Sequence, residues 1–284
     1  MRVPIYQVDA FTDTLFGGNP AAVCPLQGWL PDATMQAVAA ENNLAETAFF
    51  VRSGSDYMLR WFTPKVEVDL CGHATLASGY VVLRFIEPGS ETVNFRTAKA
   101  GTLTVSRRGD LLVMDFPARP AAPVEPPPGL LAALGGKPRE VLRARDHLVV
   151  YGSAAEIAAL TPDLGALAEV ESWAVIVTAP GANGVDFVSR FFAPRQGVPE
   201  DPVTGSSHCT LVPYWAARLG KTELEARQIS PRGGALTCTL RGERVGIAGR
   251  AVLYLEGQIE VYPFTGSRRR SAVEVETLHS ADFK

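Results

Sequence analysis

The sequence predicts an α+β fold of two similar domains, each a β-barrel-like sheet wrapped around a central helix. Three observations predict this fold. Strand-like segments dominate both halves of the chain, two helical segments carry no charged residue, and the motifs around those helices occur twice. A helix without a polar face is normally buried on all sides, and a sheet folded around it supplies that burial. With 284 residues, the chain is long enough for two domains of ordinary size.

Composition and charge predict a soluble, cytoplasmic globular protein. The chain has 27 Lys and Arg against 30 Asp and Glu, which gives a formal net charge of −3. This balance argues against a nucleic acid or an anionic membrane as a partner. An acidic residue, Asp9, comes too early for a signal peptide. The longest charge-free runs are also shorter than the roughly 18 apolar residues that a membrane-spanning helix needs.

A proline-rich segment divides the chain into two halves. Six of the thirteen residues from Pro117 to Gly129 are prolines. Proline lacks the amide hydrogen that a central strand or a helix interior requires. We therefore predict an extended linker over 118–129, between an N-terminal domain, 1–117, and a C-terminal domain, 130–264. The C-terminal segment, about 265–284, is a candidate for packing back on the N-terminal domain.

Alternation and turn residues predict the individual elements. Strands are predicted in residues 3–9, 46–52, 58–63, 91–97, 101–107, 110–116, 146–151, 173–178, 186–192, 236–241 and 251–262. Helices are predicted in residues 32–42, 73–85, 153–160 and 206–219. The charge-free runs, Leu70 to Leu83 and Pro202 to Ala217, cover the second and the fourth of these helices.

The two halves share a set of motifs in the same order. Arg60-Trp-Phe-Thr-Pro64-Lys65 matches Arg190-Phe-Phe-Ala-Pro194-Arg195 at an offset of 130 residues. Downstream, Asp69-Leu-Cys-Gly72-His-Ala-Thr matches Pro202-Val-Thr-Gly205-Ser-Ser-His at an offset of 133. A strand, a turn with proline and a glycine that opens a buried helix therefore occur once per half. We interpret this pattern as an internal duplication.

Each half places a glycine where an extended segment turns into a charge-free helix. Gly72 is followed by His73, and Gly205 is followed by Ser206. Free amides at a helix N-terminus carry partial positive charge and bind anions. Because both halves are built alike, we predict one shared site between the two helix ends. The alternative is that the glycines only permit tight turns and that Ser206 caps its own helix.

Glu46 stands between a predicted helix and the apolar run Ala48-Phe49-Phe50. A carboxylate in such a place loses solvation, which raises its pKa toward the range useful for a general acid or base. The alternative is an exposed glutamate on the solvent face of the strand.

Other chemical motifs are weaker. Ser207-His208 with Asp201 has the residue types of a nucleophilic triad, but adjacent helical residues do not face each other and no Gly-x-Ser-x-Gly motif occurs. Gly17-Gly18-Asn19-Pro20 lacks the spacing and the lysine of a phosphate loop, so it predicts a tight turn whose backbone could approach a ligand.

The four cysteines lie far apart, and Cys71-Gly-His73 has no second ligand pair at metal spacing. No dinucleotide-binding glycine motif follows a suitable strand. We therefore expect no metal and no organic cofactor.

Several motifs follow one another along nearly the whole chain. They are Val8-Asp-Ala-Phe-Thr12 with Gly17-Gly18-Asn19-Pro20, Leu44-Ala-Glu46-Thr-Ala-Phe, Arg60-Trp-Phe-Thr-Pro64 with Glu67-Val-Asp-Leu-Cys-Gly-His-Ala-Thr75, and Phe192-Ala-Pro194 with Glu200-Asp-Pro-Val-Thr-Gly205. Together they resemble the PhzF (phenazine-biosynthesis) family of isomerases. The resemblance implies a diaminopimelate-epimerase-like fold with the active site in the cleft between the two domains. It also implies a cofactor-independent isomerase, a small carboxylated substrate that is cyclic or amino-acid-like, and a homodimer.

The resemblance also implies roles for individual residues. Glu46 would shuttle the proton, while His73, Asp201 and Ser206 would position the substrate and assist the transfer. The residues implied in substrate binding are Gly18, Asn19, Cys71, Gly72 and Gly205.

Cys71 leaves two alternative functions open. Related epimerases and racemases use two cysteines, one at each helix start. Cys71 precedes Gly72, but Thr204 stands before Gly205, so a two-thiol inversion lacks its second thiol. We expect Cys71 near the cleft, with a thiol pKa that the helix start could lower, but not as the essential base. The alternatives are an epimerase or racemase that uses Cys71 with a nonthiol partner, and a small-molecule-binding protein without catalysis.

Overall fold

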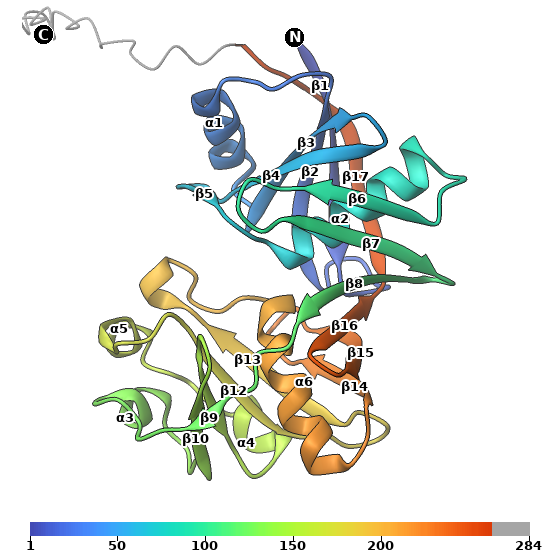
Figure 1. Cartoon of the computed structure of the whole chain (residues 1–284). Helices are drawn as coiled ribbons and strands as arrows, with labels where there is room; N and C mark the ends of the chain where they lie inside the picture. The colour runs from blue at the N-terminus through green and yellow to red at the C-terminus, as the bar shows by residue number, and fades with distance from the viewer. Residues whose placement is uncertain (263–284) are drawn as a thin grey trace, which may run out of the picture.

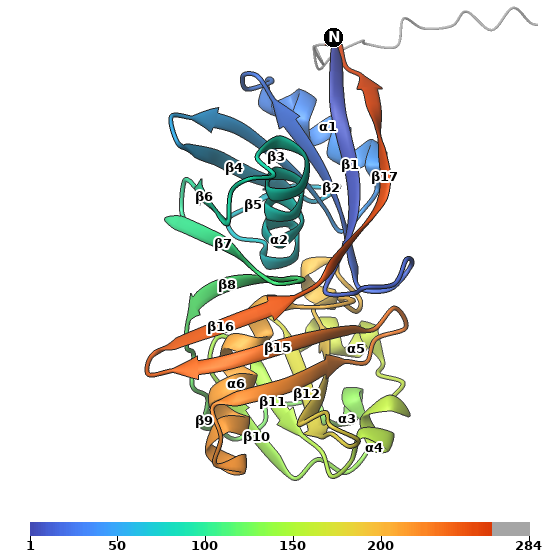
Figure 2. The ribbon, with the colours of Figure 1, turned by 90° about the vertical axis from the view of Figure 1, so that its right-hand side faces the viewer.

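Residues 1–262, the part of the chain that our computed structural model describes, form two lobes stacked end to end (Figure 1). The first lobe contains β1 (Arg2–Ala10), β2 (Asn19–Leu26), α1 (Asp32–Asn42), β3 (Glu46–Ser53), β4 (Asp56–Phe62), β5 (Glu67–Val68), α2 (Gly72–Val81), the π-helical turn η1 (Val82–Ile86), β6 (Thr92–Arg96), β7 (Thr102–Arg108) and β8 (Leu111–Pro117). Figure 2 shows α2 inside this lobe, with strands around it.

The second lobe follows the proline-rich segment. It contains β9 (Ala122–Pro123), α3 (Leu130–Leu134), β10 (Glu140–Arg143), β11 (His147–Val150), α4 (Ala154–Ala158), α5 (Leu164–Glu169), β12 (Val175–Pro180), β13 (Phe187–Phe192), the 3₁₀ turn η2 (Pro194–Gln196), α6 (Gly205–Leu219), β14 (Glu223–Gln228), β15 (Gly234–Arg241) and β16 (Arg244–Gly249). The last strand, β17 (Ala251–Glu260), leaves this lobe again. The predicted linker, 118–129, contains the short strand β9 and no other helix or strand, and it ends in a turn at Pro128 and Gly129.

The two lobes repeat one scheme of strand pairing. In the first lobe, β1–β2 is antiparallel, β2–β3 parallel, β3–β4 antiparallel and β4–β6 parallel, and β6, β7 and β8 continue antiparallel. In the second lobe, β10–β11, β11–β12, β12–β13 and β13–β14 follow the same alternation, and β14, β15 and β16 continue antiparallel. The sequence repeat therefore corresponds to a repeat in the sheet.

The described strands nevertheless belong to one mixed sheet rather than to two separate barrels. β8 and β16, the last strands of the two repeats, pair antiparallel from Leu112–Gly249 to Pro117–Arg244. An edge strand exposes unpaired N–H and C=O groups, and pairing the two edges satisfies both of them. One continuous cluster of buried apolar side chains accordingly extends through both lobes, from Trp61 in β4 to Trp215 in α6.

The predicted boundary of the second domain at residue 264 disagrees with the structure. β17 pairs with β1 along its length, from Arg2–Glu260 to Ala10–Ala251, so the chain already returns to the first lobe at residue 251. The apolar residues Val3 and Val261 are buried there in a cluster with α1. The predicted return of 265–284 lies outside the described residues.

The two charge-free helices are buried as predicted. No residue of α2 is exposed, and Gly79 packs directly against Val105 of β7. In α6, the residues from Gly205 to Ala216 are buried or partly buried, and only the last turn is exposed. None of the described helices is long and apolar enough to cross a membrane.

Some strands are missing from the sequence prediction. β2 contains Pro20 and Pro25, which argue against a strand, yet it pairs with β1 and β3. β14 alternates exposed charged residues with buried Leu224, Ala226 and Gln228, so its inward face carries little apolar signal. β10 and β16 are similarly rich in charged or small residues.

The contact between α2 and β7 gives a test of the buried helix. A Cβ on Gly79 would lie 2.5 Å from Cγ1 of Val105. We expect Gly79→Ala to reduce the free energy of unfolding by about 1–3 kcal/mol, because overpacking forces the two elements apart. Urea denaturation measures this loss.

A double variant and a control identify the cause. Adding Val105→Ala to Gly79→Ala should recover part of the lost stability, because the two changes share one contact. A Cβ on Gly28 meets nothing within 4 Å, so Gly28→Ala should cost little. Equal losses for Gly79→Ala and Gly28→Ala would contradict the packing explanation.

Candidate active site

The N-termini of α2 and α6 meet at Gly72 and Gly205. A Cβ built on Gly72 would lie 3.7 Å from Cα of Gly205, and one built on Gly205 would lie 3.9 Å from Cα of Gly72. The repeat predicts this meeting of the two helix ends. The N-cap residues are Cys71 and Thr204, and within residues 1–262 neither side chain forms a capping hydrogen bond. The alternative in which Ser206 caps α6 is therefore wrong. The leading amides of both helices remain available to an anion.

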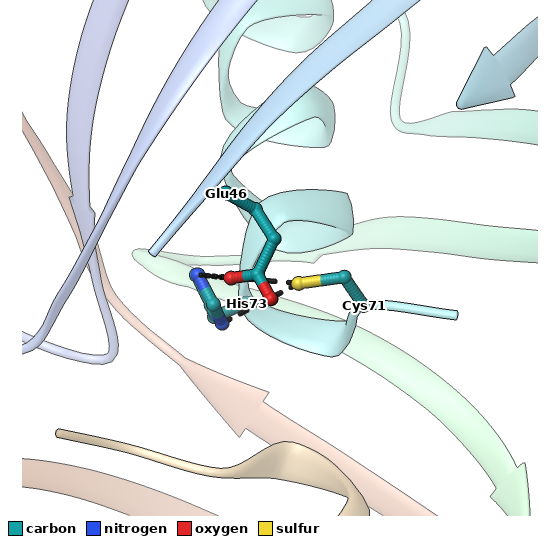
Figure 3. Close-up of side chains that lie close together, drawn as sticks. All are labelled: Glu46, Cys71 and His73. Carbon is teal, nitrogen blue, oxygen red and sulfur yellow. Dashed lines mark hydrogen bonds and ion pairs between the residues drawn. The ribbon is translucent and has the colours of Figure 1, made fainter. Parts of the chain in front are cut away.

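Glu46, Cys71 and His73 form a cluster beside the start of α2 (Figure 3). Glu46 Oε2 lies 3.1 Å from His73 Nε2. Cys71 Sγ lies 3.5 Å from Nδ1 and 3.9 Å from Nε2 of the same ring. The side chain of Glu46 is 17% exposed and that of His73 is 6% exposed. The alternative of an exposed glutamate on a solvent face is therefore wrong.

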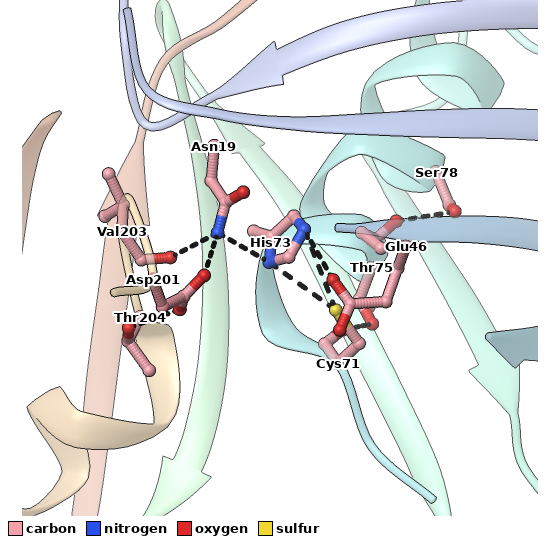
Figure 4. A network of polar contacts seen from close by, with 10 residues as sticks. Asn19, Glu46, Cys71, His73, Thr75, Ser78, Asp201, Val203 and Thr204 are labelled. Atoms are coloured by element: carbon pink, nitrogen blue, oxygen red, sulfur yellow. Dashed lines mark hydrogen bonds and ion pairs between the residues drawn. The ribbon is translucent and has the colours of Figure 1, made fainter. Parts of the chain in front are cut away.

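Asn19 connects this cluster to the second lobe (Figure 4). Its Nδ2 lies 3.1 Å from His73 Nδ1. The same nitrogen donates to Asp201 Oδ1 at 2.8 Å and to the Val203 carbonyl at 2.9 Å. A chain of polar contacts thus runs from Glu46, at the start of β3, to Asp201, ahead of α6.

Asp201 is held from its own lobe as well. Thr204 Oγ1 donates to Asp201 Oδ2. Gln228, at the end of β14, donates to the Asp201 carbonyl at 2.7 Å and accepts from the Thr204 amide at 2.9 Å. These contacts fix the segment that leads into α6.

The turn that carries Asn19 is locked by a residue distant in sequence. Arg232 donates to the carbonyl of Gly18 at 2.9 Å, to that of Gly17 at 2.9 Å and to Asp9 Oδ1 at 2.8 Å. Gly18 has a φ of +61°, and a Cβ there would lie 2.2 Å from the Ala10 carbonyl oxygen. Its amide donates to the Gly233 carbonyl at 2.8 Å. Both polar groups of Gly18, implied above in substrate binding, are therefore used within the protein.

Burial and mutual charge shift the pKa values of three site residues. Burial disfavours a charged His73, but the Cys71 sulfur and the Glu46 carboxylate raise the pKa of His73 well above its usual range. Burial raises the pKa of Asp201 to about 6, although His73, Thr204 and Asn19 favour its ionised form. Burial and Glu46 raise the pKa of Cys71 to about 11. The expected lowering of this thiol pKa is wrong, because burial outweighs the helix end.

The cluster beside α2 is also a set of possible metal ligands. Ligand atoms of Glu46, Cys71 and His73 all lie within 4.8 Å of one another. Three protein ligands of these types are sufficient for a catalytic zinc ion. Binding would require the Cys71 thiolate, which the raised thiol pKa opposes, and would remove both Glu46 and His73 from proton transfer. A site without metal stays a prediction.

The remaining predicted residues lie on the first turn of α6. Ser206 is partly buried, and its hydroxyl forms no hydrogen bond with residues 1–262. Ser207 and His208 do contact each other, at 3.3 Å, contrary to expectation. Both bond the Thr204 carbonyl, however, and burial lowers the pKa of His208 to about 4. Ser207 and His208 therefore bond the backbone at the buried start of α6 and do not form a nucleophilic triad.

Sequence reasoning missed the residues that hold the site together. Gln228 ends a strand in which alternate residues point inward, and that alternation is the only local signal it gives. Arg232 gives no local signal, and although Asp9 lies in the first family motif, its bond to Arg232 joins residues 223 positions apart in the sequence.

Fold and site together define a duplicated mixed α/β protein with an acid–base cluster where two helix N-termini meet. The chain belongs to the phenazine biosynthesis-like (PhzC-PhzF) family, whose model matches residues 8–257. It is 54% identical to an uncharacterized isomerase of Pseudomonas aeruginosa, over 92% of this chain and 100% of that protein. It is 45% identical to an uncharacterized isomerase of Halalkalibacterium halodurans, over 91% of this chain and 99% of that protein.

Solved structures agree with the fold. The crystal structure of a PhzF-family protein from Enterococcus faecalis has a TM-score of 0.89 and 46% identity, covering 92% of this chain and 100% of that one. A hydroxyproline epimerase from Agrobacterium vitis has a TM-score of 0.60 at 12% identity, covering 91% of each chain. At that identity, the second comparison shows a shared fold alone.

The raised pKa of Asp201 predicts a pH dependence of stability. The pKa of Asp201 in the folded protein, about 6, lies above its value in the unfolded chain. Protonated Asp201 therefore adds to the free energy of unfolding below the unfolded pKa, and this contribution is lost as the pH rises through about 6. Between about pH 4.5 and pH 7 the loss should be about 2 kcal/mol. Urea denaturation should show that Asp201→Asn loses less stability than the unchanged protein over this range.

Asp56 provides the control for this measurement. Arg96 lowers the pKa of Asp56, so this carboxylate is ionised throughout the tested range. Asp56→Asn should therefore leave the pH dependence as it is. Parallel stability curves for the unchanged protein and Asp201→Asn would show that Asp201 does not titrate as inferred.

Proposed function

We propose that the protein is a cofactor-independent isomerase that moves a proton on a small carboxylated metabolite, cyclic or amino-acid-like. Glu46 is the acid and base in this proposal. One observation carries it: the Glu46 side chain is largely buried, and its Oε2 forms an ion pair with His73 Nε2 at 3.1 Å. A carboxylate with a free lone pair beside an imidazole can accept a substrate proton and return it.

His73 and Asp201 assist from opposite sides of Asn19. A protonated His73 stabilises the Glu46 carboxylate before it takes the proton. Asp201, with a pKa of about 6, titrates near neutral pH and can hold or release a proton during the reaction. Ser206 lies on the first turn of α6, and its hydroxyl has no hydrogen-bond partner among the described residues, so it is available to a bound substrate.

The two helix ends supply the place for the substrate carboxylate. The leading amides of α2 and α6 converge at Gly72 and Gly205, and two helix ends aimed at one point favour an anion more than one does. Donors fixed in advance also stabilise charge that develops during proton removal. In this proposal each lobe is a domain with its sheet around a central helix, and the substrate enters between the domains.

The relatives support the reaction class. Two proteins with 54% and 45% identity, each matched over nearly its whole length, carry the name isomerase. Neither name gives a substrate, so the substrate class here rests on the paired helix ends.

Removal of the Glu46 acid–base group is the central test. Glu46→Gln keeps the shape of the side chain but cannot exchange a proton. We expect kcat to fall by about 10²–10⁴-fold with a much smaller change in substrate affinity. The measurement is deuterium incorporation from D₂O into a panel of carboxylated metabolites, followed by mass spectrometry.

Glu169 is a matched control, because it is exposed at the end of α5. Glu169→Gln should incorporate deuterium at the normal rate, and a chelator should leave that rate unchanged. Near-normal exchange in Glu46→Gln would place the base elsewhere. Thermal stabilisation by a metabolite that never exchanges deuterium would instead favour a binding protein without catalysis.

A thiol-dependent epimerase is the second candidate, because Cys71 Sγ lies 3.5 Å from His73 Nδ1. The raised thiol pKa and the threonine at the matching N-cap of α6 argue against it. We expect Cys71→Ser to keep kcat within about threefold of the normal value. Cys209→Ser, in the buried part of α6, is the control for a general effect of thiol loss. If Cys71→Ser loses as much activity as Glu46→Gln, the epimerase becomes the better assignment.

A further inference from the structure

We infer that Asn19 is a positioning residue. Its side-chain amide binds Asp201 across the boundary between the lobes. It also keeps the proton of the neutral His73 ring on Nε2, the nitrogen that faces Glu46. The Asn19 contacts and the His73 tautomer do not depend on which reaction the protein catalyses, while the expected effect on turnover rests on the proposed function.

The orientation of the Asn19 amide is fixed by its neighbours. Nδ2 faces Asp201 Oδ1 at 2.8 Å and the Val203 carbonyl at 2.9 Å, and both of these atoms accept hydrogen bonds. In the flipped orientation, Oδ1 would face the same two oxygens, acceptor against acceptor. The side chain is fully buried, so water does not compete for these contacts.

This orientation decides which ring nitrogen of His73 carries the proton. Nδ1 lies 3.1 Å from Nδ2 of Asn19, a nitrogen that carries hydrogens and no free lone pair. A proton on Nδ1 would therefore point at another N–H group. The neutral ring avoids this contact by carrying its proton on Nε2, which lies 3.1 Å from Glu46 Oε2.

Three titratable groups face His73 and influence which of its ring nitrogens carries the proton. Glu46, from β3, and Cys71, ahead of α2, lie on the first lobe, and Asp201 approaches from the second lobe through Asn19. The Cys71 sulfur, 3.5 Å from Nδ1, is the partner that could draw a proton to that nitrogen. Asn19 opposes this transfer, so the neutral ring keeps its proton on Nε2, facing Glu46, and presents the Nδ1 lone pair to the Asn19 amide.

Asn19 acts on Asp201 through the same nitrogen. A hydrogen bond donated to a carboxylate favours its ionised form. The Asn19 bond to Oδ1 and the Thr204 bond to Oδ2 therefore oppose the effect of burial on Asp201. One amide thus influences the protonation of a residue in each lobe.

The turn before Asn19 is rigid enough for this role. Gly18 adopts a positive φ close to the Ala10 carbonyl, and Arg232 binds the carbonyls of both Gly17 and Gly18. Asn19 Oδ1 is buried and has no partner in the described part of the chain. The contacts of Nδ2 alone therefore set the orientation of the amide.

Nuclear magnetic resonance of the histidine rings tests the inference without a substrate. The protein is labelled with ¹⁵N in histidine only, and the His73 signals are assigned from their loss in His73→Gln. In the unchanged protein above the His73 pKa, we expect the tautomer with the proton on Nε2. In Asn19→Asp, a carboxylate replaces the donor beside Nδ1, and the His73 pKa should rise by at least about one unit.

Turnover provides the second readout. In Asn19→Asp, kcat should fall at least about tenfold with KM within about threefold, and the pH profile of kcat/KM should shift in the same direction as the His73 pKa. Asn183 is exposed in the turn between β12 and β13, so Asn183→Asp should leave both readouts unchanged.

Two results would overturn the inference. One is a neutral His73 with its proton on Nδ1 in the unchanged protein, a measurement that needs no variant. The other is a folded Asn19→Asp protein whose His73 pKa stays within about 0.3 unit of the original value. If Asn19→Asp does not fold, Asn19→Ala replaces it and should give a mixture of tautomers; an unchanged Nε2 tautomer there also refutes the inference. The expected ring signals together with normal exchange in Glu46→Gln would instead refute the proposed function alone.

Discussion

The contact between the starts of α2 and α6 is the constraint on which the rest of the site depends. The backbones at Gly72 and Gly205 are so close that a single added methyl group would fill the space between them. Two helix N-termini in contact bring together two regions of partial positive charge, which repel each other. Buried negative groups offset this repulsion. Glu46, which pairs with His73 at the start of α2, and Asp201, four residues ahead of Gly205, provide that charge when they are ionised.

The polar network and the sheet have complementary roles. The sheet brings the two lobes together through the β8–β16 pairing and the return of β17 to β1. The network around Asn19 then sets the geometry of individual atoms, because Arg232 fixes the turn and Gln228 fixes the segment before α6. Buried polar groups specify geometry in this way only when nearly all of them are bonded.

Local signals in the sequence were sufficient for the repeat and for the buried helices. The matched motifs around Arg60 and Arg190 predicted equivalent strands, and the absence of charge predicted the burial of α2 and α6. Glu46 and His73 also come together as the family motifs imply. Contacts between distant residues that lie outside the repeat and the family motifs were not predictable. The Arg232 bond to Gly18 spans 214 residues, and the pKa of Cys71 depends on burial that its motif does not encode.

The duplication is symmetric in backbone but not in chemistry. The first lobe places a thiol at the N-cap of its central helix, a histidine at the second helical position and a glutamate at the start of β3. In the second lobe, the N-cap is Thr204, the second helical position is Ser206, and β12 is preceded and opened by the buried apolar run Ala174-Val175-Ile176. An inversion that uses two opposed bases needs a titratable group from each lobe at equivalent positions. Since only the first lobe provides one there, the asymmetry favours a single base that removes a proton and returns it on the same face of the substrate.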